Sequence, residues 1–583
     1  MHCTGQTGTQ AASSQHLCVM TKVTVSTPST KCWLRDGPSP AADDILNPAA
    51  QPAALLITNK QASNFACHSA GPRLAAVLGW PDECHVAVRR PPRGPSTRGR
   101  TFRPSCPVSQ TWRVPQVRAL DSADAGVRSF WMADALVDEA NLPKAEALTS
   151  SARADVCIVG GGFTGLWTAI ELKSRIPSID VVVLEAGLCG CGASGTNAGI
   201  LMNLWPKLPA LVRAGGKDEG ADVARASVEA IDHIRRFCLE HGIDAQVEPN
   251  GWLWASNNSS QDGAWVETLE TAAAHRDSPF VEVDAEEATR LAGAPARGGV
   301  FDPTCVGLHP ARLVRGLLRV ARALGVIVHE HSPMTGLTRE HAGTTVSTST
   351  GSVQASSVIL AINAWCNQFP QLRAHLVTTA SDNVVVRPRR TLGEPPLTNV
   401  SDAGRLLDYW RPMTGGNVLF GKAGMGLGWG IRGTNTLYAS VPRPDRLVTQ
   451  MTRAVPSLKD STVLSSWRAP VEYSLSSLPF FGELGGFPGV YFGTGYSGDG
   501  IGPSVIGAQI LAGLATETRD GMTTSFLARM PSGRGLPREP IRYVGGQLVK
   551  TAMIRQDLKQ DAEDKVDLAT RLTARIDPTS FLG

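Results

Sequence analysis

Three glycines between positions 160 and 165 are the residues whose spacing points most clearly to chemistry. Gly160, Gly162 and Gly165 follow the pattern G-x-G-x-x-G directly after the apolar run 155–159. The first glycine permits a sharp turn out of a strand, the second lets backbone N–H groups approach a pyrophosphate, and the third lets the next helix pack closely. Glu185 ends the next apolar run, where its carboxylate can accept hydrogen bonds from a ribose. The pattern predicts a dinucleotide site without specifying the dinucleotide.

Hydrophobic periodicity predicts the elements that position these residues. A strand over 155–159, a helix over 164–173 and a strand over 181–184 form a βαβ unit. We also predict helices over 222–241, 310–324 and 503–515, and strands over 251–255, 326–329, 344–348 and 358–362. Residues 384–473 are β-rich, and 528–583 form a mostly polar tail. We therefore expect an α/β fold, with a Rossmann-like domain and an inserted, mainly antiparallel β domain.

The overall composition is that of a globular protein, with 42% hydrophobic and 19% charged residues. No apolar run approaches the roughly 18 residues that cross a bilayer, so we predict no membrane span. Cys189 and Cys191 form a C-x-C pair that lacks the second pair or the histidines of a zinc site. We therefore expect reduced thiols, no metal and a cytoplasmic protein.

Residues 1–127 show no sustained period of a helix or strand, and we treat them as an extension. They are either a disordered tail, an organelle-targeting peptide suggested by the acid-free, Ser/Thr-rich residues 1–35, or translated sequence upstream of the true start. We favour the first and third interpretations over the targeting peptide. The arginine-rich stretch 86–118 has few aromatic residues, so we predict no nucleic-acid partner. The folded body is expected over 128–583.

Several segments of this body resemble one family. GLCGCGASGTNAG (187–199), VILAINAW (358–365) and the stretch from LPFFGEL to ILA (478–512) resemble the D-amino-acid-oxidase-like FAD-dependent amine oxidoreductases. The likeness is greatest to the branch of aminophosphonate oxidoreductases and γ-glutamylputrescine oxidases. It implies FAD-binding segments over 152–235, 300–370 and 466–520, substrate-domain segments over 236–299 and 371–465, and a C-terminal tail over 528–583.

The resemblance also implies the residues that bind FAD. Gly160, Gly162 and Gly165 would hold the pyrophosphate, and Glu185 the adenosine ribose. The flavin ring would lie between two groups of residues, Ser194, Thr196 and Asn197 on one side and Gly495, Gly498 and Ile501 on the other. The helix that begins after Pro503 would direct its N-terminus at flavin O2. FAD is expected to be non-covalent, because covalent relatives use a histidine in the 187–199 loop or a late cysteine, and no cysteine follows Cys366.

Two departures from the family bear on the substrate. Thr196 stands where the branch usually has an arginine near the flavin. Val471 stands where amino-acid-oxidising relatives carry an arginine that clamps the substrate carboxylate, and an apolar side chain cannot form that bidentate contact. We therefore expect either a substrate other than a plain α-amino acid or a carboxylate held elsewhere, with Arg411 and Arg468 as candidates.

The expected reaction is oxidation of a C–N bond in a small primary or secondary amine of the amino-acid, polyamine or aminophosphonate type. Hydride would pass to flavin N5, the resulting imine would hydrolyse, and oxygen or another electron acceptor would reoxidise the flavin. The residues predicted to orient the amine are Trp252, Trp254, Tyr409, Trp410 and Arg411. Core packing explains the alternation of Trp252 and Trp254 equally well.

Two other functions remain open at this point. One is a flavin-dependent hydroxylase, which the segment Asp499–Pro503 disfavours because it lacks the usual GD-A-A-H-type sequence. The other is a flavoprotein that has lost amine oxidation, in which the changes at Thr196 and Val471 record that loss. His233, His309 and His329 lack triad or metal partners in the sequence and are expected to be structural.

Overall fold

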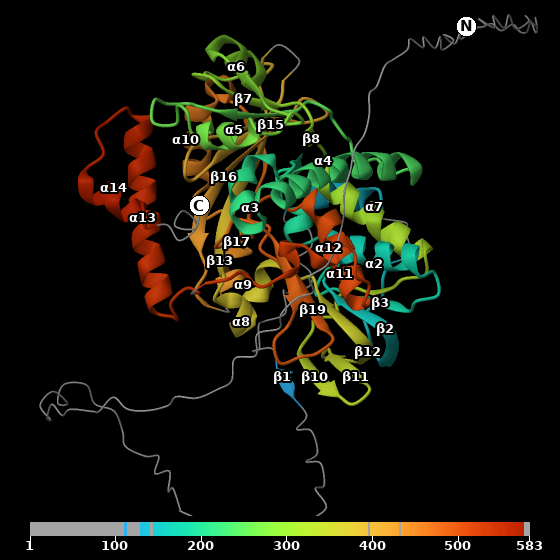
Figure 1. The fold of residues 1–583 in the computed structure, drawn as a ribbon. Helices are drawn as coiled ribbons and strands as arrows, with labels where there is room; N and C mark the ends of the chain where they lie inside the picture. Colours follow the sequence, from blue (N-terminus) through green and yellow to red (C-terminus); the bar gives the residue numbers. More distant parts are fainter. Residues whose placement is uncertain are drawn as a thin grey trace, which may run out of the picture. The chain divides into compact units, whose positions relative to one another are not determined.

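The computed structural model describes residues 110–113, 129–139, 144–393, 397–430, 433–533 and 535–576. Within this part of the chain, two sheets and the helices packed on them carry the candidate site (Figure 1). Apart from 110–113, the predictions made for residues 1–127 lie outside the described residues.

The first sheet carries the glycine fingerprint. Its parallel strands, in spatial order, are β19 (Val490–Thr494), β12 (Ser352–Leu360), β2 (Ser151–Val159), β3 (Val181–Leu184) and β9 (Ile327–His329). Antiparallel neighbours extend it: β11 (Gly343–Ser347), β10 (Gly336–Glu340) and β1 (Thr111–Arg113) beyond the first half of β12, and β18 (Phe480–Glu483) beyond β19. All four residues of β3 are buried, as expected of a parallel strand covered on both faces.

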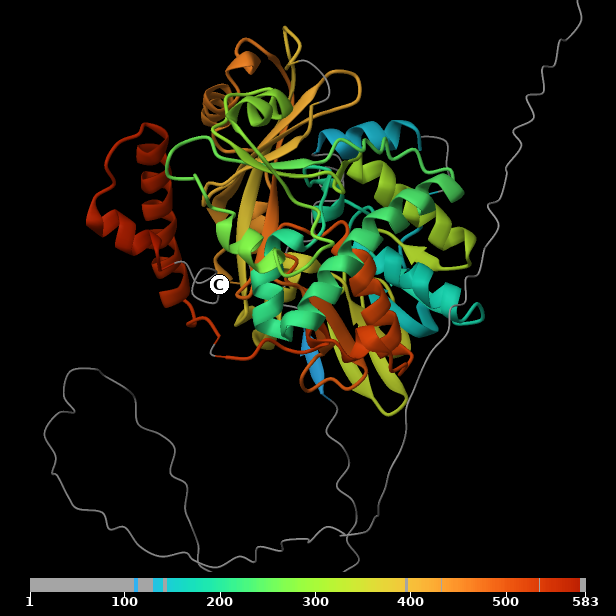
Figure 2. The same ribbon diagram turned by 45° about the horizontal axis from the view of Figure 1, so that its top comes forward.

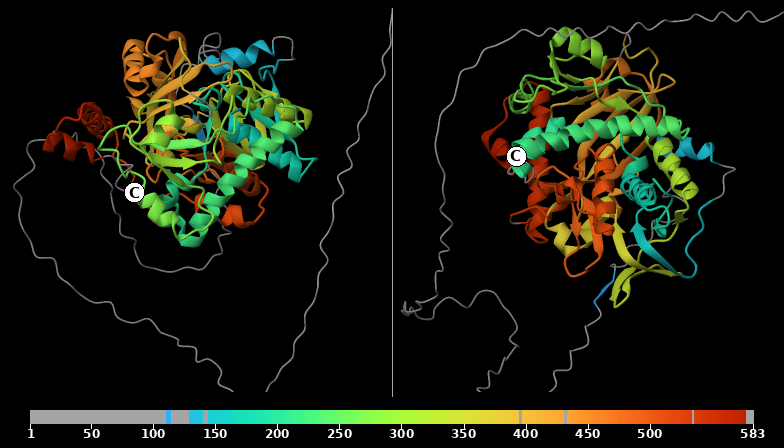
Figure 3. Two further views of the ribbon diagram at one scale, coloured as in Figure 1. Left: turned by 90° about the horizontal axis from the view of Figure 1, so that it is seen from above. Right: turned by 45° about the vertical axis from the view of Figure 1, so that its right-hand side comes forward.

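One face of this sheet is covered by helices that share a core with it. These helices are α2 (Phe163–Arg175), α4 (Lys217–Glu240), α7 (Pro310–Ala323) and α11 (Pro503–Ala515). α2 lies between α7 and α11, and Figure 3 shows the three helices side by side. Ile158, Leu317 and Leu511 meet in this core with no exposed surface. The predicted helices at 164–173, 222–241, 310–324 and 503–515 are thus confirmed, with ends shifted by a few residues at most of the termini.

The second sheet is the predicted β domain. Its strands, in spatial order, are β17 (Thr462–Ser474), β13 (Leu376–Arg387), β16 (Val418–Leu427), β15 (Asp408–Pro412), β14 (Asn399–Asp402), β5 (Trp252–Ala255), β7 (Gly299–Asp302) and β6 (Val281–Val283). Every pair is antiparallel except β14 with β5, so the sheet is mainly antiparallel as predicted. The predicted domain boundaries at 300 and 466 are too early, because β7 and β17 belong to this sheet.

Smaller elements connect the two sheets. β4 (Ile200–Leu201) and β8 (Val306–Gly307) form a two-stranded ribbon. Further helices are α1 (Phe130–Val137), α3 (Leu208–Gly215), α5 (Val266–Ala272), α6 (Ala285–Ala292), α8 (Pro370–Arg373), α9 (Gly433–Leu437), α10 (Pro444–Ala454) and α12 (Gly521–Thr524). Among the described helices, none combines the length and the hydropathy that a bilayer crossing requires.

Two segments differ from the sequence-based expectation. Strand β1 lies within residues 1–127, for which we expected no regular structure, and it pairs with β10. The C-terminal tail contains α13 (Ile541–Asp561) and α14 (Leu568–Ala574), which lie beside strands of the second sheet (red in Figures 1 and 2). The side of α13 that faces the sheet includes polar residues such as Gln556, so the apolar period that predicts a helix is weak there.

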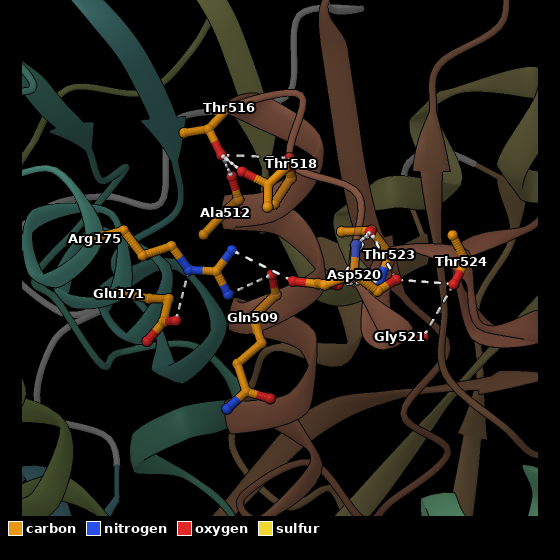
Figure 4. A network of polar contacts seen from close by, with 11 residues as sticks. Glu171, Arg175, Gln509, Ala512, Thr516, Thr518, Asp520, Gly521, Thr523 and Thr524 are labelled. Atoms are coloured by element: carbon orange, nitrogen blue, oxygen red, sulfur yellow. Dashed lines mark hydrogen bonds and ion pairs between the residues drawn. The ribbon is translucent and has the colours of Figure 1, made fainter.

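A polar network joins α2 to α11 and α12 (Figure 4). The Arg175 Nε atom donates to Glu171 at 2.8 Å, one of its Nη atoms donates to the Gln509 carbonyl at 3.4 Å, and the other lies 3.7 Å from an Asp520 carboxylate oxygen. Asp520 in turn accepts from the Thr523 N–H in a capping box. The network holds the C-terminal end of α2 in place, so that the opposite end of this helix can present the glycine turn.

Candidate active site

A cavity of about 1060 Å³ connects the glycine turn with the second sheet. On the first-sheet side, its lining includes Gly160, Gly162, Glu185, Ser194, Thr196 and Asn197. On the second-sheet side, its lining includes Ser381, Asn383, Ser401, Tyr409, Val471 and Glu472. The cavity thus lies at the carboxyl ends of β2 and β3, where ligands bind in open α/β sheets.

The glycine turn leaves no room for side chains. Gly160 has a φ of +112°, and a Cβ atom added there would lie 2.3 Å from the Ala361 carbonyl oxygen. A Cβ on Gly162 would lie 2.8 Å from Ser194 Oγ, and one on Gly165 would lie 1.9 Å from the Gly160 carbonyl oxygen. Gly160 and Gly162 line the cavity, but Gly165 does not. Gly165 therefore allows helix α2 to pack closely on the turn, and of the three predicted pyrophosphate residues it is the one that lies outside the cavity wall.

Glu185 occupies the position predicted for a ribose ligand. Its two carboxylate oxygens accept hydrogen bonds from Gly161 N–H at 2.8 Å and Gly187 N–H at 2.9 Å, which fix the side chain at the cavity wall. Burial raises the pKa of Glu185 above its usual range, and these two backbone hydrogen bonds oppose the shift. Each oxygen keeps a lone pair for a ligand hydroxyl.

The loop over 187–199 is held to both domains by side-chain hydrogen bonds. Ser194 Oγ accepts from the Phe163 N–H at 2.8 Å, in the first turn of α2. The Thr196 carbonyl accepts from Trp467 Nε1 at 2.8 Å, which connects the loop to β17. Asn197 Nδ2 donates to the carbonyls of the preceding turn, at 2.9 and 3.0 Å. Ser194, Thr196 and Asn197 all line the cavity, as the sequence predicted.

The segment before α11 forms another part of the wall. Gly498 and Ile501 line the cavity, and α11 begins directly afterwards at Pro503. Gly495 does not line the cavity itself, but its N–H group donates to Oε1 of the cavity-lining Glu472 at 2.6 Å. Gly495 is thus placed behind the wall and not in it.

Tyr409 is the one residue of the predicted aromatic wall that reaches the cavity. Its hydroxyl donates to Asn383 Oδ1 at 2.8 Å and lies 2.6 Å from Ser381 Oγ. Burial raises the pKa of the Tyr409 phenol, so the hydroxyl stays protonated at neutral pH. Val471, on β17, also lines this end of the cavity.

The predicted tryptophans lie elsewhere. Trp252 and Trp254 do not line the cavity. Trp252 is buried, and its Nε1 donates to Ser401 Oγ at 3.1 Å, while Trp254 packs edge-on against Trp265. Trp410 points to the opposite face of the second sheet, where its Nε1 donates to the Ala292 carbonyl. Trp252 and Trp410 are buried and Trp254 is partly buried, and all three lie outside the cavity wall, so their predicted role in orienting the amine is corrected.

Arg411 is also buried away from the cavity. Its guanidinium donates to the carbonyl oxygens of Gly199 and Leu308, at 2.5 and 2.7 Å, and forms an ion pair with Glu248 at 3.0 Å. Burial lowers the pKa of Arg411 to about 10, so it remains charged at neutral pH. Arg411 thus joins the loop over 187–199 to the second sheet and does not contact a substrate. The other candidate, Arg468, pairs with Asp382 at 2.7 Å and also lies outside the cavity wall.

Sequence reasoning missed several residues of the wall. Lys207 lines the cavity and pairs with Asp499 at 2.7 Å, a contact between distant segments that no local pattern reveals. Glu472 is buried and accepts hydrogen bonds from the Thr494 hydroxyl and the Gly495 N–H, both at 2.6 Å. Burial raises the pKa of Glu472 to about 7. Its position next to Val471 could have drawn attention to it.

The arrangement fits a flavin dinucleotide. The glycine turn would meet the pyrophosphate with backbone atoms, because any side chain at Gly162 would fill the space beside Ser194. Glu185 offers acceptors to a ribose on one side of that turn. On the other side, the loop over 187–199 and the segment over 496–501 leave a space for the flavin ring between them.

Comparisons with known proteins agree with this fit. The profile of the family "FAD dependent oxidoreductase" matches residues 155–514. The probable oxidoreductase OrdL of Haemophilus influenzae is 27% identical over 63% of this chain and 83% of its own length. The γ-glutamylputrescine oxidoreductase of Escherichia coli is 28% identical over 69% of this chain and 93% of its own length.

Among solved structures, glycine oxidase from Geobacillus kaustophilus superimposes with a TM-score of 0.55 and 20% identity. The match covers 65% of this chain and all of that one, and it shows the shared fold. The family match spans more than half of the chain and includes the glycine turn, Glu185 and the cavity wall formed by β17 and the segment before α11. The chain belongs to the family of FAD-dependent oxidoreductases.

Proposed function

We propose that this enzyme oxidises a C–N bond of a small primary or secondary amine that carries no α-carboxylate. The observation that carries the proposal is the composition of the cavity wall on the second sheet. Ser381, Asn383, Ser401, Tyr409 and Val471 are uncharged there, and Glu472 contributes a carboxyl group and no positive charge. Arg113 is the one arginine in the described lining, and it belongs to β1 at the edge of the first sheet. A substrate carboxylate would therefore find no guanidinium partner in this part of the wall.

Bound FAD supplies the two-electron acceptor for a hydride that leaves the substrate carbon next to nitrogen. The chain's own residues orient that carbon. Tyr409 is held by Asn383 and Ser381, so its phenol is a fixed, protonated group that can hydrogen-bond to a polar substrate atom. When the hydride and an N–H proton have left, the C–N bond is an imine, which water hydrolyses to a carbonyl compound and ammonia for a primary amine, or a carbonyl compound and a smaller amine for a secondary one.

The relatives support this substrate class in part. The name of the Escherichia coli relative specifies γ-glutamylputrescine, whereas that of the Geobacillus structure specifies glycine, an α-amino acid. The absence of a guanidinium from the described second-sheet wall favours an amine over an amino acid. Oxygen or another acceptor would take up the electrons in the last step.

The experiment compares amines with the amino acids that differ only by an α-carboxylate. Suitable pairs are 2-phenylethylamine with phenylalanine, cadaverine with lysine, and ethanolamine with serine. Each is mixed anaerobically with the purified holoenzyme, and loss of visible flavin absorbance is followed. We expect at least one amine to reduce the flavin faster than its amino acid. Faster reduction by the amino acid in every reactive pair would contradict the proposal.

Val471 provides a matched test of the same idea. The substitution Val471→Arg places a guanidinium at the position where the resemblance expects a carboxylate clamp, and Val471→Leu changes size without charge. We expect Val471→Arg to move the preference toward the amino acid of the pair, while Val471→Leu keeps the preference for the amine. An equal response of the two variants would show that charge at this position does not select the substrate.

FAD is proposed to be bound without a covalent link. Cys191 is the one cysteine in the described part of the cavity wall, and burial raises the pKa of its thiol to about 12. The thiol therefore stays protonated, and a protonated thiol is a poor nucleophile. Acid precipitation should release all of the flavin into the supernatant. Flavin that stays with the precipitated protein would show a covalent bond.

A further inference from the structure

Strand β1 comes from the N-terminal extension but lies at one end of the cavity. Thr111, Trp112 and Arg113 line this end together with the segment over 333–336. The Ser332 N–H donates to the Glu185 carbonyl at 2.7 Å, so this segment starts beside the predicted ribose ligand. The opposite end of the cavity is lined by Tyr409. Strand β1 is therefore placed at the adenosine end of the FAD site.

The strand is held by pairing and by one anchoring side chain. Residues 111–113 pair with 336–338 of β10, and the Arg339 N–H donates to the Gln110 carbonyl at 2.9 Å. The Trp112 ring stacks on Phe369, with the ring centroids 5.4 Å apart and an angle of 29° between the rings. Phe369 is buried in the core of the first sheet, so Trp112 attaches a short edge strand to that core.

Strand β10 is shaped to accept this neighbour. Gly336 stands opposite Arg113, and a Cβ atom added to Gly336 would lie 2.9 Å from the Trp112 carbonyl oxygen. A residue with a side chain at this position would push β1 away from the sheet. The close approach of the two backbones thus depends on a glycine in β10, independently of the residues of β1 itself.

We propose that residues 110–113 form a clasp over the adenosine end of the bound FAD, with Trp112 as the anchor and Arg113 as the cofactor-facing residue. Trp112 positions the strand through its contact with Phe369. The planar guanidinium of Arg113 can stack on the adenine ring or donate hydrogen bonds to it. The clasp lowers the rate at which FAD dissociates. This inference depends on FAD binding and is independent of the substrate proposed above.

The test measures FAD binding to the full-length apoprotein by flavin fluorescence and FAD release by stopped flow. In Trp112→Ala the anchor is lost, and we expect dissociation to be roughly tenfold faster, about the effect of 1.4 kcal/mol. Arg113→Ala removes an exposed side chain without disturbing the anchor, and we expect a change of roughly threefold. Trp429→Ala is the matched control, because Trp429 is half-exposed, packs on Tyr543 and lies outside the cavity wall.

The outcomes separate a clasp from a general loss of stability. Faster release in the Trp112 and Arg113 variants, with Trp429→Ala equal to wild type, supports the proposal. Equal release rates in wild type and both β1 variants would overturn it, and so would the same acceleration in all three variants. If Trp112→Ala does not fold, Arg113→Ala decides alone, and an unchanged dissociation rate in that variant overturns the proposal.

Discussion

At the glycine turn of the first sheet the cavity wall is backbone, whereas at the second-sheet end it is formed by side chains from several strands. Gly160 and Gly162 meet the ligand space with no side chain, and Glu185 is oriented by two backbone N–H groups. Tyr409, by contrast, depends on Asn383 and Ser381 from a neighbouring part of the sheet. A backbone-built site tolerates little change, while a site built from side chains can be altered one contact at a time.

The largest effect is expected at the first-sheet end. In Gly165→Ala, the new Cβ atom would meet the Gly160 carbonyl oxygen at 1.9 Å, so the helix and the turn must separate. We expect a destabilisation of about 3 kcal/mol or more and loss of bound FAD. Flavin content and thermal unfolding measure both.

The control for this prediction is Gly545→Ala in helix α13, where an added Cβ atom contacts nothing within 4 Å. Alanine is the better helix former, so this variant should be as stable as wild type or more stable by up to about 1 kcal/mol. If Gly165→Ala were as stable as Gly545→Ala and kept its FAD, the close approach of Gly165 to the Gly160 carbonyl oxygen would not constrain the turn.

Arg411 joins the loop over 187–199 to the second sheet outside the cavity, and Arg411→Leu tests whether its role is structural. The substitution leaves two carbonyl oxygens and Glu248 without their buried partner. We expect a loss of about 3 kcal/mol in the free energy of unfolding, measured with urea. Kinetic constants per folded enzyme should change little.

Arg235→Leu is the matched control for Arg411, because Arg235 forms an exposed ion pair with Asp232. It should alter stability by less than about 0.5 kcal/mol. A large fall in kcat for Arg411→Leu at unchanged stability would instead indicate that Arg411 contacts the substrate.

Glu472 connects the segment before α11 to the second sheet, and its titration should be visible in the pH dependence of stability. Its pKa is about 7 in the folded protein, above the usual value of 4.5, because of burial. The folded state therefore binds more protons than the unfolded state between these values, and stability falls as the pH rises through this window. Urea denaturation from pH 5 to pH 8 should show the decline.

Glu472→Gln mimics the protonated acid, so it should match wild type at pH 5 and be more stable than wild type at pH 8. Glu483→Gln, at an exposed glutamate on β18, should retain the wild-type pH dependence. If the free energy of unfolding fell equally with pH in wild type and in Glu472→Gln, Glu472 would not be the group that causes the decline.

The smallest effect is expected from Tyr409→Phe at the second-sheet end. The variant removes the hydroxyl that bonds to Asn383 but keeps the ring. We expect kcat/KM for the amine to fall roughly threefold to tenfold, the effect of one hydrogen bond, with flavin affinity unchanged. Tyr543→Phe, outside the cavity wall, should have no kinetic effect. If Tyr409→Phe lowered the affinity for FAD as much as it lowered kcat/KM, the two ends of the cavity would not have separate roles in binding cofactor and substrate.

The parts of the site that could be predicted from sequence are those set by local backbone geometry. The glycine turn, Glu185 and the 187–199 loop follow each other closely along the chain, and their patterns reflect contacts in and directly after one βαβ unit. The helix that starts at Pro503 lies far along the chain, but its pattern also reflects a local strand–helix connection. Gly165 and Gly495 are the two predicted cofactor residues that do not line the cavity, and the difference concerns which way a backbone group points. That direction depends on a packing partner elsewhere, Gly160 or Glu472.

Only the tertiary structure identified the residues that line the second-sheet end of the cavity. Trp252, Trp254 and Tyr409 are all aromatic residues in predicted strands, and only the arrangement of β5, β14 and β15 places Tyr409 at the cavity and the tryptophans outside its wall. The pairing of Lys207 with Asp499 and the docking of β1 on β10 also join segments far apart in the chain. The sequence by itself determined the cofactor site, because its constraints are local. The substrate wall required the tertiary structure, because its residues meet only when the second sheet has formed.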